Sequence, residues 1–548
     1  MDPLPLALGI LLFALLGTAA GVATGLTPGL HVNTVAALVL AFQAPLLFLG
    51  GFLFSWASPT PQDLALLAAA LVVGNVIAHT FLDFIPAIFL GAPEAETALS
   101  VLPGHRMLLR GRGLEAIHLS AWGSMAAALL AIGLILPFRL VMGTPLGGYQ
   151  DLQPVIPYLL VLVAAILIVG ESGSSRSGRV ELACRLPDGL LHETESVPEI
   201  LQLSPSEASG VDEAFLLRGK VEEVVGRRLL VTDGLCSVEV RADGPVPSSL
   251  QGEVRLFVAC ARRPSPRASL VARGWATLVF LLAGYLGFLV LFSPLGVANW
   301  YPVPALQADA RTVGFLPLFT GLFALPTLLI SLARTPHIPR QERSRGRAKL
   351  PPRDQVRAIL GGSLMGAFVA WIPGVTGATA TVFSHLLSGE EGRRDNDERF
   401  ILSLSCVNTS TALFTIVALF VILRARSGGA AAVQTLGGDL VAAWDPLLGV
   451  PAALVWLLLA AVVTAGASYF LTRGFGGLFA RLSGAFPYRK MVLGVLLFLV
   501  GLILLLAGTT GLVVAAFATL VGLLPPLVGV RRIHLMGSLL LPLIVLLG

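Results

Sequence analysis

Residues 25–34 read Gly-Leu-Thr-Pro-Gly-Leu-His-Val-Asn-Thr, and residues 371–379 read Trp-Ile-Pro-Gly-Val-Thr-Gly-Ala-Thr. Each stretch interrupts a long apolar segment with Pro-Gly and then supplies small polar residues. A shift of 345 positions aligns five identities that shape a backbone: Gly17, Gly21, Pro28, Gly29 and Thr34 with Gly362, Gly366, Pro373, Gly374 and Thr379. This common register predicts an internal duplication.

Each Pro-Gly pair predicts a break in a helix. Proline lacks an N–H and clashes with the preceding turn, and glycine tolerates backbone conformations that other residues resist. Inside a bilayer, such a break is tolerated only where it is buried in protein or lines a watery cavity. A helix that restarts beyond the break directs its N-terminal amides into that cavity, which favours an anion. The alternative is a kink or a loop between ordinary helices.

The composition is that of a polytopic helical membrane protein. Of 548 residues, 55% are hydrophobic and 13% are charged, and the mean hydropathy is +0.84. Many apolar runs reach the ~20 residues that span a bilayer. The first run lacks a basic n-region, so we expect a membrane segment and not a cleaved signal peptide. The four cysteines form no Cys-x-x-Cys motif, which indicates neither a zinc site nor a disulfide framework.

The distribution of basic residues predicts the orientation. Arginine and lysine are absent before Arg106 and then gather at 106–112, on both sides of 172–272, and at 334–357. The positive-inside rule places these loops in the cytoplasm. We therefore expect a multi-pass protein of the cell membrane. The candidate membrane segments are 4–27, 30–56, 64–91, 114–142, 154–171, 274–294, 313–333, 358–372, 375–389, 400–424, 441–472, 488–508, 510–530 and 533–548.

This topology predicts two inverted repeats. The first Pro-Gly lies in the region without basic residues and the second directly follows a basic loop, so the two copies are entered from opposite faces. The halves 358–372 and 375–389 are too short to cross, which favours a re-entrant hairpin. Inverted repeats whose broken helices meet near the midplane are typical of secondary transporters. The expected units are a repeat at 1–171, an insert at 172–272, a connecting hairpin at 273–333, a basic cytoplasmic loop at 334–357, and a second repeat with trailing helices at 358–548.

The insert is predicted to be a small β-rich domain. Alternating runs at 215–225, 228–232, 237–241 and 253–260 indicate four or five strands, and Asp233-Gly234 suits a hairpin turn. The stretch from Leu217 to Val240 resembles an OB-fold domain, a small β-barrel that often binds nucleic acid. Acidic and basic residues nearly balance and aromatics are few, so no nucleic-acid partner is expected. We expect an accessory or regulatory module, with structural filler as the alternative.

Polar residues inside the spans form the second part of the candidate site. Asn75, His79 and Asp83 share a helix face, and the run 408–411 occupies a comparable place after the second break. Asn75 and Phe81 match Asn408 and Phe414 at equal spacing. Such residues usually face a pathway, but hydrogen bonds that hold a helix bundle together explain them equally well. His79 with Asp83 also suits a proton relay.

The predicted substrate-binding residues combine the two breaks with these polar faces. They are Thr27, Pro28, Gly29, His31, Asn33, Thr34, Asn75, His79, Pro373, Gly374, Thr376, Gly377, Thr379, Asn408 and Thr411. No P-loop, Rossmann fingerprint or other catalytic motif accompanies them. We therefore expect no enzyme, no catalytic residue, no metal, and no cofactor apart from a coupling ion, Na⁺ or H⁺.

The sequence also resembles a known family. Residues 25–30 resemble the opening of the TctA family, the large membrane subunit of tripartite tricarboxylate transporters, and Ile372-Pro373-Gly374 is similar to its second-half motif. His105 ends a Pro-Gly-His where the family has Asp-Gly-Tyr, which makes the chain most similar to the divergent archaeal branch. Stretches similar to the family signature after the third helix are 91–100 (Gly-Ala-Pro-Glu-Ala-Glu-Thr-Ala-Leu-Ser), 103–106 (Pro-Gly-His-Arg), 111–116 (Gly-Arg-Gly-Leu-Glu-Ala) and 123–124 (Gly-Ser).

This resemblance covers most of the membrane part and not the insert. It implies secondary uptake of carboxylates, driven by an ion gradient and fed by a periplasmic binding protein together with a small membrane subunit. It also implies that polar residues at 27–34 and 373–381 hold the substrate carboxylates.

Residues 372–379 resemble, in addition, the Pro-Gly-Val-Ser-Gly-Gly-Thr motif of polyprenyl-phosphate translocases. This implies a lipid phosphate as the alternative ligand, because helix N-termini bind phosphate as well as carboxylate. A third possibility is a membrane sensor or scaffold that reads out through the β insert. We favour a carrier of small carboxylates that works by alternating access. The sequence leaves open whether the chain forms a homo-oligomer.

Overall fold

The structure is a computed structural model that covers the whole chain. The residues it describes are 1–28, 35–36, 39–40, 42–90, 103–104, 107–108, 111–171, 180–185, 195–196, 213–225, 228–232, 237–242, 252–262, 266–292, 310–334, 341, 350–373, 375, 377, 380–381, 396–445, 449–485 and 488–547. Seven predicted site residues lie outside them: Gly29, His31, Asn33, Thr34, Gly374, Thr376 and Thr379.

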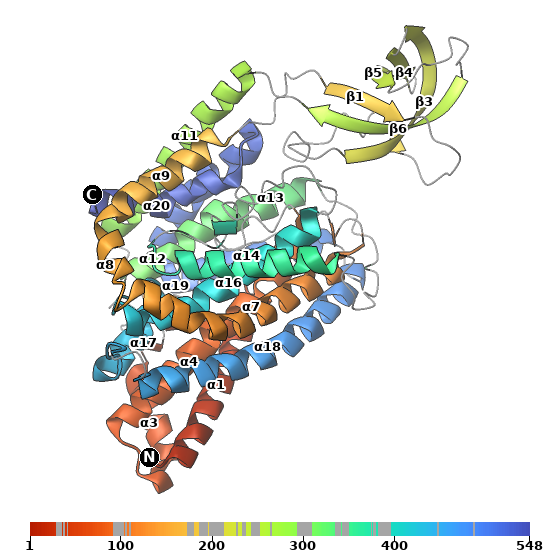
Figure 1. Cartoon of the computed structure of the whole chain (residues 1–548). Helices are drawn as coiled ribbons and strands as arrows, with labels where there is room; N and C mark the ends of the chain where they lie inside the picture. The colour runs from red at the N-terminus through yellow and green to blue at the C-terminus, as the bar shows by residue number, and fades with distance from the viewer. Residues whose placement is uncertain are drawn as a thin grey trace.

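The membrane part is helical (Figure 1). Within the described ranges, nine helices are long and apolar enough to cross a membrane. The helices are α1 (Pro3–Leu26), α3 (Gln43–Leu53), α4 (Pro61–Leu82), α5 (Phe84–Phe89), α7 (Gly113–Met142), α8 (Gly148–Leu152), α9 (Ile156–Val169), α11 (Pro266–Phe292), α12 (Ala310–Phe319), α13 (Leu325–Arg334), α14 (Pro352–Val369), α16 (Asn396–Val421), α17 (Gly428–Gly437), α18 (Ala452–Ala485), α19 (Tyr488–Val528) and α20 (Gly537–Leu547).

Some boundaries differ from the predicted segments. The segment predicted at 441–472 is wrong at both ends, since α18 begins only after Pro451, which lacks an N–H and suits the start of a helix. α19 contains a non-helical residue, Gly508, with φ of 61°. A straight helix of 41 residues would extend ~60 Å, twice the thickness of the hydrocarbon core. Gly508 thus divides α19 where the sequence predicted two segments.

The first broken helix lies beside the next long helix. α1 ends at Leu26, shortly before Pro28, and packs along α4. The amino group of Met1 lies 2.7 Å from the carboxylate of Asp63 at the start of α4. The two helices therefore start at the same end, and the chain between them returns to the side from which α1 began.

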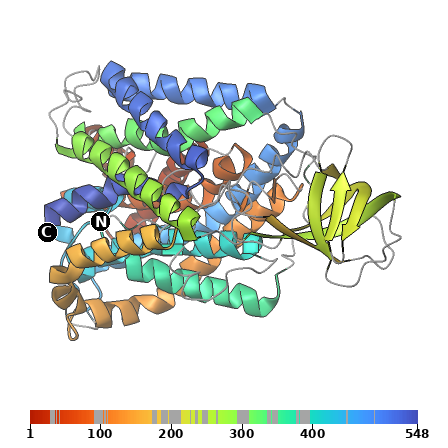
Figure 2. The same ribbon diagram turned by 90° about the horizontal axis from the view of Figure 1, so that it is seen from above.

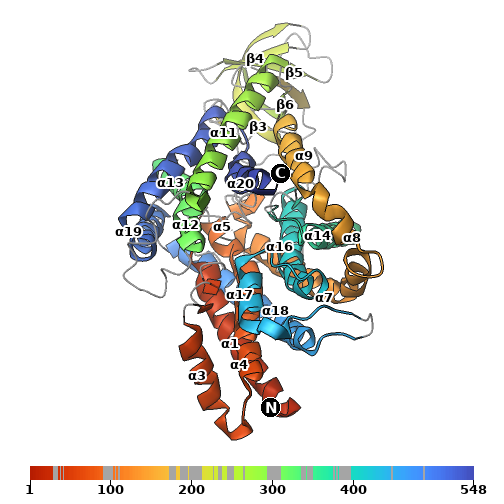
Figure 3. The same ribbon diagram turned by 90° about the vertical axis from the view of Figure 1, so that its left-hand side faces the viewer.

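The second broken helix repeats this arrangement. α14 ends at Val369, shortly before Pro373, and packs along α16. At the start of α16, Arg399 lies 3.7 Å from Asp354 at the start of α14. α14 and α16 therefore start at the same end, as α1 and α4 do. Figure 3 shows α1, α3 and α4 as one group and α7, α14 and α16 as another.

α4 and α16 form the core of the helical part. In the apolar window of each span, 83% of the α4 residues and 94% of the α16 residues are buried, against 39% in both α7 and α18. α7 packs along α16 and α18 along α4, while α1 contacts α18 and α14 contacts α7. The long helices α7 and α18 thus cover the central helices α16 and α4, respectively.

The contacts also fix the directions of these helices. α7 runs parallel to α16, because Arg112 meets Glu398 at one end and Phe138 meets Phe414 further along. α7 and α18 run antiparallel, because Ile117 near the start of α7 lies against Gly476 near the end of α18. α18 runs with α1 and α4, since it meets α1 through Thr464 and α5 through Phe479. The central helices α4 and α16 are therefore antiparallel.

The strands lie apart from the helices (Figure 2). They are β1 (Val180–Arg185), β2 (Glu195–Ser196), β3 (Glu213–Val225), β4 (Arg228–Thr232), β5 (Ser237–Ala242) and β6 (Gly252–Arg262), and they pair in the order β2-β3-β4-β5-β1-β6. β3 also pairs with β6, and the pairing of β1 with β5 is parallel. Four strands coincide within a few residues with the runs predicted from alternation.

Candidate functional site

The two broken helices pack against α4 and α16 through matched glycines. At each glycine, an added methyl group would lie within 3 Å of a backbone carbonyl on the neighbouring helix, so the two backbones are in direct contact. The matched contacts are Gly17 with the Leu71 carbonyl (2.1 Å), Gly362 with the Ser403 carbonyl (2.7 Å), Gly21 with the Asn75 carbonyl (2.7 Å) and Gly366 with the Val407 carbonyl (2.7 Å).

These contacts define which residues of α4 and α16 are equivalent. They relate Asn75 to Val407, so the predicted match of Asn75 with Asn408 is wrong by one residue. Matching residues by equal spacing in the sequence takes no account of connecting loops of different length. The glycine contacts show directly which residues of α4 and α16 are equivalent. With this register, His79 and Thr411 occupy equivalent positions.

Asn75 and His79 are both brought to the end of α1. The side chains are 1% and 4% exposed, respectively. The Asn75 amide donates to the hydroxyl oxygen of Thr24 over 3.3 Å, and Nδ1 of His79 lies 3.1 Å from the same oxygen. Thr24 is one turn before Pro28 and was not among the predicted site residues. Its hydroxyl connects the polar face of α4 to the first break.

Asn408 and its neighbours join the two central helices. Nδ2 of Asn408 donates to a carboxylate oxygen of Asp83 over 3.0 Å, and the hydroxyl oxygens of Thr80 and Thr409 are 3.2 Å apart. Thr411 instead donates to the carbonyl of Gly366 on α14, over 3.3 Å. The predicted polar faces are thus buried and mutually hydrogen-bonded, close to the point where α4 crosses α16.

The second break receives an arginine that the sequence analysis did not single out. Arg426, in the loop between α16 and α17, donates to the carbonyl of Val375, two residues after Pro373. The predicted site residue Gly377 is buried, and its carbonyl accepts from Thr381 over 2.8 Å. Arg424 and Arg426 directly follow the apolar span of α16, and basic residues at the end of a span are the signal that would have identified Arg426.

A cavity of about 510 Å³ lies beside the first break. Two predicted site residues, Thr27 and Pro28, line it, and Lys490 at the start of α19 supplies a positive charge. The rest of the lining is mainly apolar: Leu26, Leu90, Phe479, Leu482, Met491, Gly494, Val495 and Phe498. Such a cavity suits a ligand with an anionic group and an apolar part.

Ion pairs close the end of the bundle where α7, α14 and α16 begin. The guanidinium of Arg112 donates to both carboxylate oxygens of Glu115, over 2.9 and 2.8 Å, and also to Glu398. Hydrogen bonding to Glu115 and the nearby charge of Glu398 raise the pKa of Arg112 above its ordinary value. Within the described ranges, no three His, Cys, Asp or Glu side chains gather where they could hold a metal ion.

Comparisons with known proteins identify a family. A family model described as the tripartite tricarboxylate transporter TctA family matches residues 11–182 and 268–537. An uncharacterised protein of Methanocaldococcus jannaschii is 23% identical over 431 residues, which are 78% of this chain and 74% of the relative. No solved structure matches the chain. The family match includes both broken helices and omits most of the strands.

Proposed function

The chain belongs to the tripartite tricarboxylate transporter TctA family, a family of membrane transporters and not of enzymes, and on this basis we propose that it carries small carboxylates into the cell by secondary active transport. The observation that carries the proposal is the equivalent packing of two helices that end at Pro-Gly, α1 on α4 and α14 on α16. A helix that restarts after each Pro-Gly would present backbone amides without partners in the helix, and such amides bind carboxylates.

In this proposal the repeats at 1–171 and 358–548 are two units related by inversion. Their central helices, α4 and α16, are antiparallel. α7 of the first unit covers α16 of the second, and α18 of the second covers α4 of the first, which is the reciprocal pattern of a two-fold axis. The breaks lie on either side of the contact between Thr80 and Thr409. That contact lies near the middle of α16 and toward the end of α4, and we place substrate bound between the breaks near the midplane. Alternating access would then rock one unit against the other.

We place the basic loops and the insert in the cytoplasm by the positive-inside rule. Substrate would arrive at the opposite face from a binding protein, with a small membrane subunit beside the chain and Na⁺ or H⁺ as coupling ion. The predicted binding residues keep their roles here, with Thr24 and Arg426 added. His79 and Asp83 are buried near the first break, which suits a proton relay as one form of coupling.

The insert is proposed to be an OB-like β-barrel with a regulatory or accessory role. The strands β3, β4, β5, β1 and β6 pair in that order, and β6 pairs back onto β3, so the ladders close a ring. A five-stranded Greek-key ring is the arrangement of the OB fold. In this chain the strand that pairs in parallel with β5 is β1, the first strand of the insert in sequence order.

A lipid phosphate is the second candidate substrate. The cavity beside Thr27 and Pro28 supports it, because its lining is mainly apolar with a single lysine, Lys490. A polyprenyl chain could occupy the apolar part while the phosphate meets Lys490 and the amides of the break.

The proposal is tested by uptake into proteoliposomes and by thermal unfolding in detergent. Citrate and smaller carboxylates are compared with a polyprenyl phosphate, with and without Na⁺ and across pH. A ligand that binds only the folded protein raises its melting temperature. We expect carboxylates to stabilise and to be transported, and Thr34→Val and Thr379→Val to weaken both effects without loss of folded protein. Stabilisation by the lipid phosphate alone would favour the second candidate, and full transport by both variants would contradict the proposed site.

A further inference from the structure

Arg139, near the end of α7, is the largest fully buried side chain of the described residues, with 1% exposure. Its Nη2 donates to the hydroxyl of Thr144 over 2.9 Å. Its Nε and Nη1 are buried and have no hydrogen-bond partner within the described part of the chain. A guanidinium is always charged and carries five N–H donors, so most of its hydrogen-bonding capacity is unused here.

Such a group is costly to keep inside a membrane protein. Buried charges are ordinarily paired and fully hydrogen-bonded, and an ionisable residue within a span usually lines a ligand pathway. Removing Arg139 in favour of an apolar residue would avoid that cost. Its unused donors therefore point to an anionic ligand that is bound in another state of the transport cycle.

Two residues that follow α17, Trp444 and Asp445, lie beside Arg139. Trp444 places its ring 5.9 Å from the guanidinium, and its backbone N–H donates to the carbonyl of Phe420 over 2.7 Å. The next residue, Asp445, is 67% exposed and places a carboxylate oxygen 3.7 Å from Nη2. Within the described part of the chain, the carboxylate of Asp445 is the only acidic group beside Arg139, and its side chain is mostly exposed to solvent.

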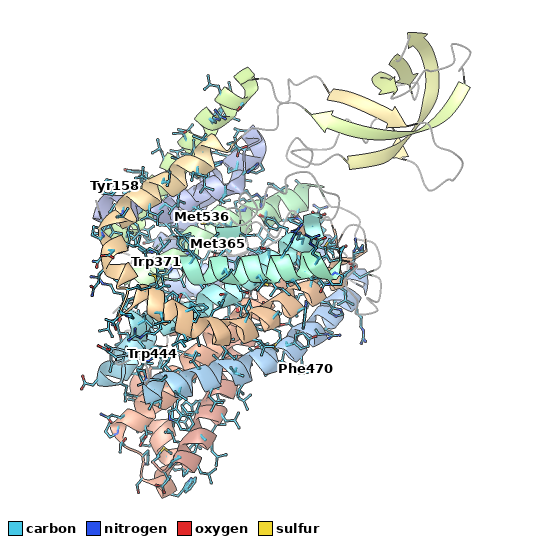
Figure 4. All side chains as sticks on the ribbon, viewed as in Figure 1. Tyr158, Met365, Trp371, Trp444, Phe470 and Met536 are labelled. Carbon is cyan, nitrogen blue, oxygen red and sulfur yellow. The ribbon has the colours of Figure 1, made fainter. Side chains whose placement is uncertain are left out.

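Arg139 also lies at the face where substrate would enter. α7 starts beside Arg112 and reaches Arg139 after ~39 Å, which is the other end of the membrane. Trp371, directly before the second break, lies on the same side as Trp444 in Figure 4 and packs against Tyr149 just beyond α7.

We propose that Arg139 is a carboxylate-binding residue of the outer entrance, and that Asp445 occupies its ligand position until a substrate carboxylate replaces it. This inference rests on the proposed function for its direction of transport. Trp444 closes the entrance over the guanidinium and must swing away to admit the substrate. Substrates with several carboxylates can reach Arg139 with one group while another remains in the solvent.

The test compares variants in uptake of labelled citrate. Arg139→Gln is expected to raise KM for uptake into intact cells by about ten- to a hundredfold, with kcat less affected. Arg139→Lys keeps the charge and should recover part of the affinity. Asp445→Asn removes the internal competitor and should lower KM by up to about fivefold. The matched control is Arg473→Gln, because Arg473 also lies over an aromatic ring, 5.4 Å from that of Tyr469, but is exposed.

Inverted membrane vesicles provide a second readout. A residue of the outer entrance affects KM from the outside and leaves KM from the cytoplasmic side unchanged, whereas a merely structural residue affects both or neither. An unchanged outer KM in Arg139→Gln, or an equal increase from both sides, would overturn the inference while leaving the transport function intact.

A binding measurement separates this inference from the proposed function. If the natural chain transports no carboxylate, citrate is tested as a stabiliser of the purified protein. Stabilisation that disappears in Arg139→Gln, returns in part in Arg139→Lys, and persists in Arg473→Gln supports the carboxylate site without transport. Absence of stabilisation in the natural chain, or equal stabilisation of all variants, rejects the site.

Discussion

Asp83 on α4 accepts a hydrogen bond from the side-chain amide of Asn408 on α16, over 3.0 Å and across 325 positions of sequence. Both side chains are almost fully buried. The bond joins the central helices α4 and α16 beside the contact of Thr80 with Thr409. Any sliding of α4 against α16 must therefore break or rearrange this bond.

The first prediction concerns this pair. Asn408→Ala should destabilise the folded protein by about 1–3 kcal/mol, because the buried carboxylate of Asp83 loses a donor. A double-mutant cycle with Asp83→Ala should give a coupling energy between about 0.6 and about 1.7 kcal/mol, the mean and the maximum measured for interhelical bonds in a membrane protein. Unfolding in detergent measures both values, and a coupling near zero would show that the two side chains do not interact in the membrane.

The second prediction tests the close packing of the broken helices. Gly21→Ala and Gly366→Ala should each cost about 1–3 kcal/mol, since the added methyl group would lie 2.7 Å or less from atoms of the neighbouring helix. Gly133→Ala on α7 is the control, because nothing lies within 4 Å of its added methyl group. It should be neutral or stabilising by up to about 1 kcal/mol. Equal effects at all three glycines would contradict the packing.

The third prediction separates a binding role from a structural role at the first break. Thr24→Val removes the hydroxyl shared by Asn75 and His79, and we expect it to raise KM for carboxylate uptake by about tenfold. Thr18→Val removes a comparable buried hydroxyl, which only bonds to Ala14 and Thr464. It should reduce the melting temperature without changing KM. If both variants lose stability and neither changes KM, the polar face of α4 only holds the bundle together.

The fourth prediction concerns orientation. Ser58 is exposed in the turn before α4, on the side where α1 begins, which the positive-inside rule places outside the cell. In a background without native cysteines, Ser58→Cys should react with a membrane-impermeant maleimide on intact cells. A cysteine at position 209 in the insert should react only after permeabilisation. The reverse pattern would invert the proposed orientation.

The sequence revealed the membrane part and its breaks through strong local signals. Apolar runs long enough to span a bilayer determine helices wherever backbone groups have no water to bond, and Pro-Gly ends them. This is why α1 and α14 end shortly before Pro28 and Pro373. Family membership was likewise predictable from short motifs, and the family match confirms it.

The partners of each polar side chain could not be predicted. Thr24 and Arg426 reach the breaks only because α1 packs on α4 and the loop after α16 folds back toward Val375. Arg139 is one basic residue in an apolar run, and its burial depends on Trp444, which follows 305 residues later. The one-residue error between Asn75 and Asn408 has the same origin, because helix register is set by contact between backbones.

The sequence by itself determined a polytopic helical protein whose helices α1 and α14 end shortly before a proline, since hydrophobic length and backbone chemistry act locally. Only the tertiary structure decided that α4 and α16 are antiparallel and buried at the centre, and that Asp83 bonds to Asn408. Hydrogen bonds and close packing act over a few ångströms in space, so they depend on which distant segments the fold brings together.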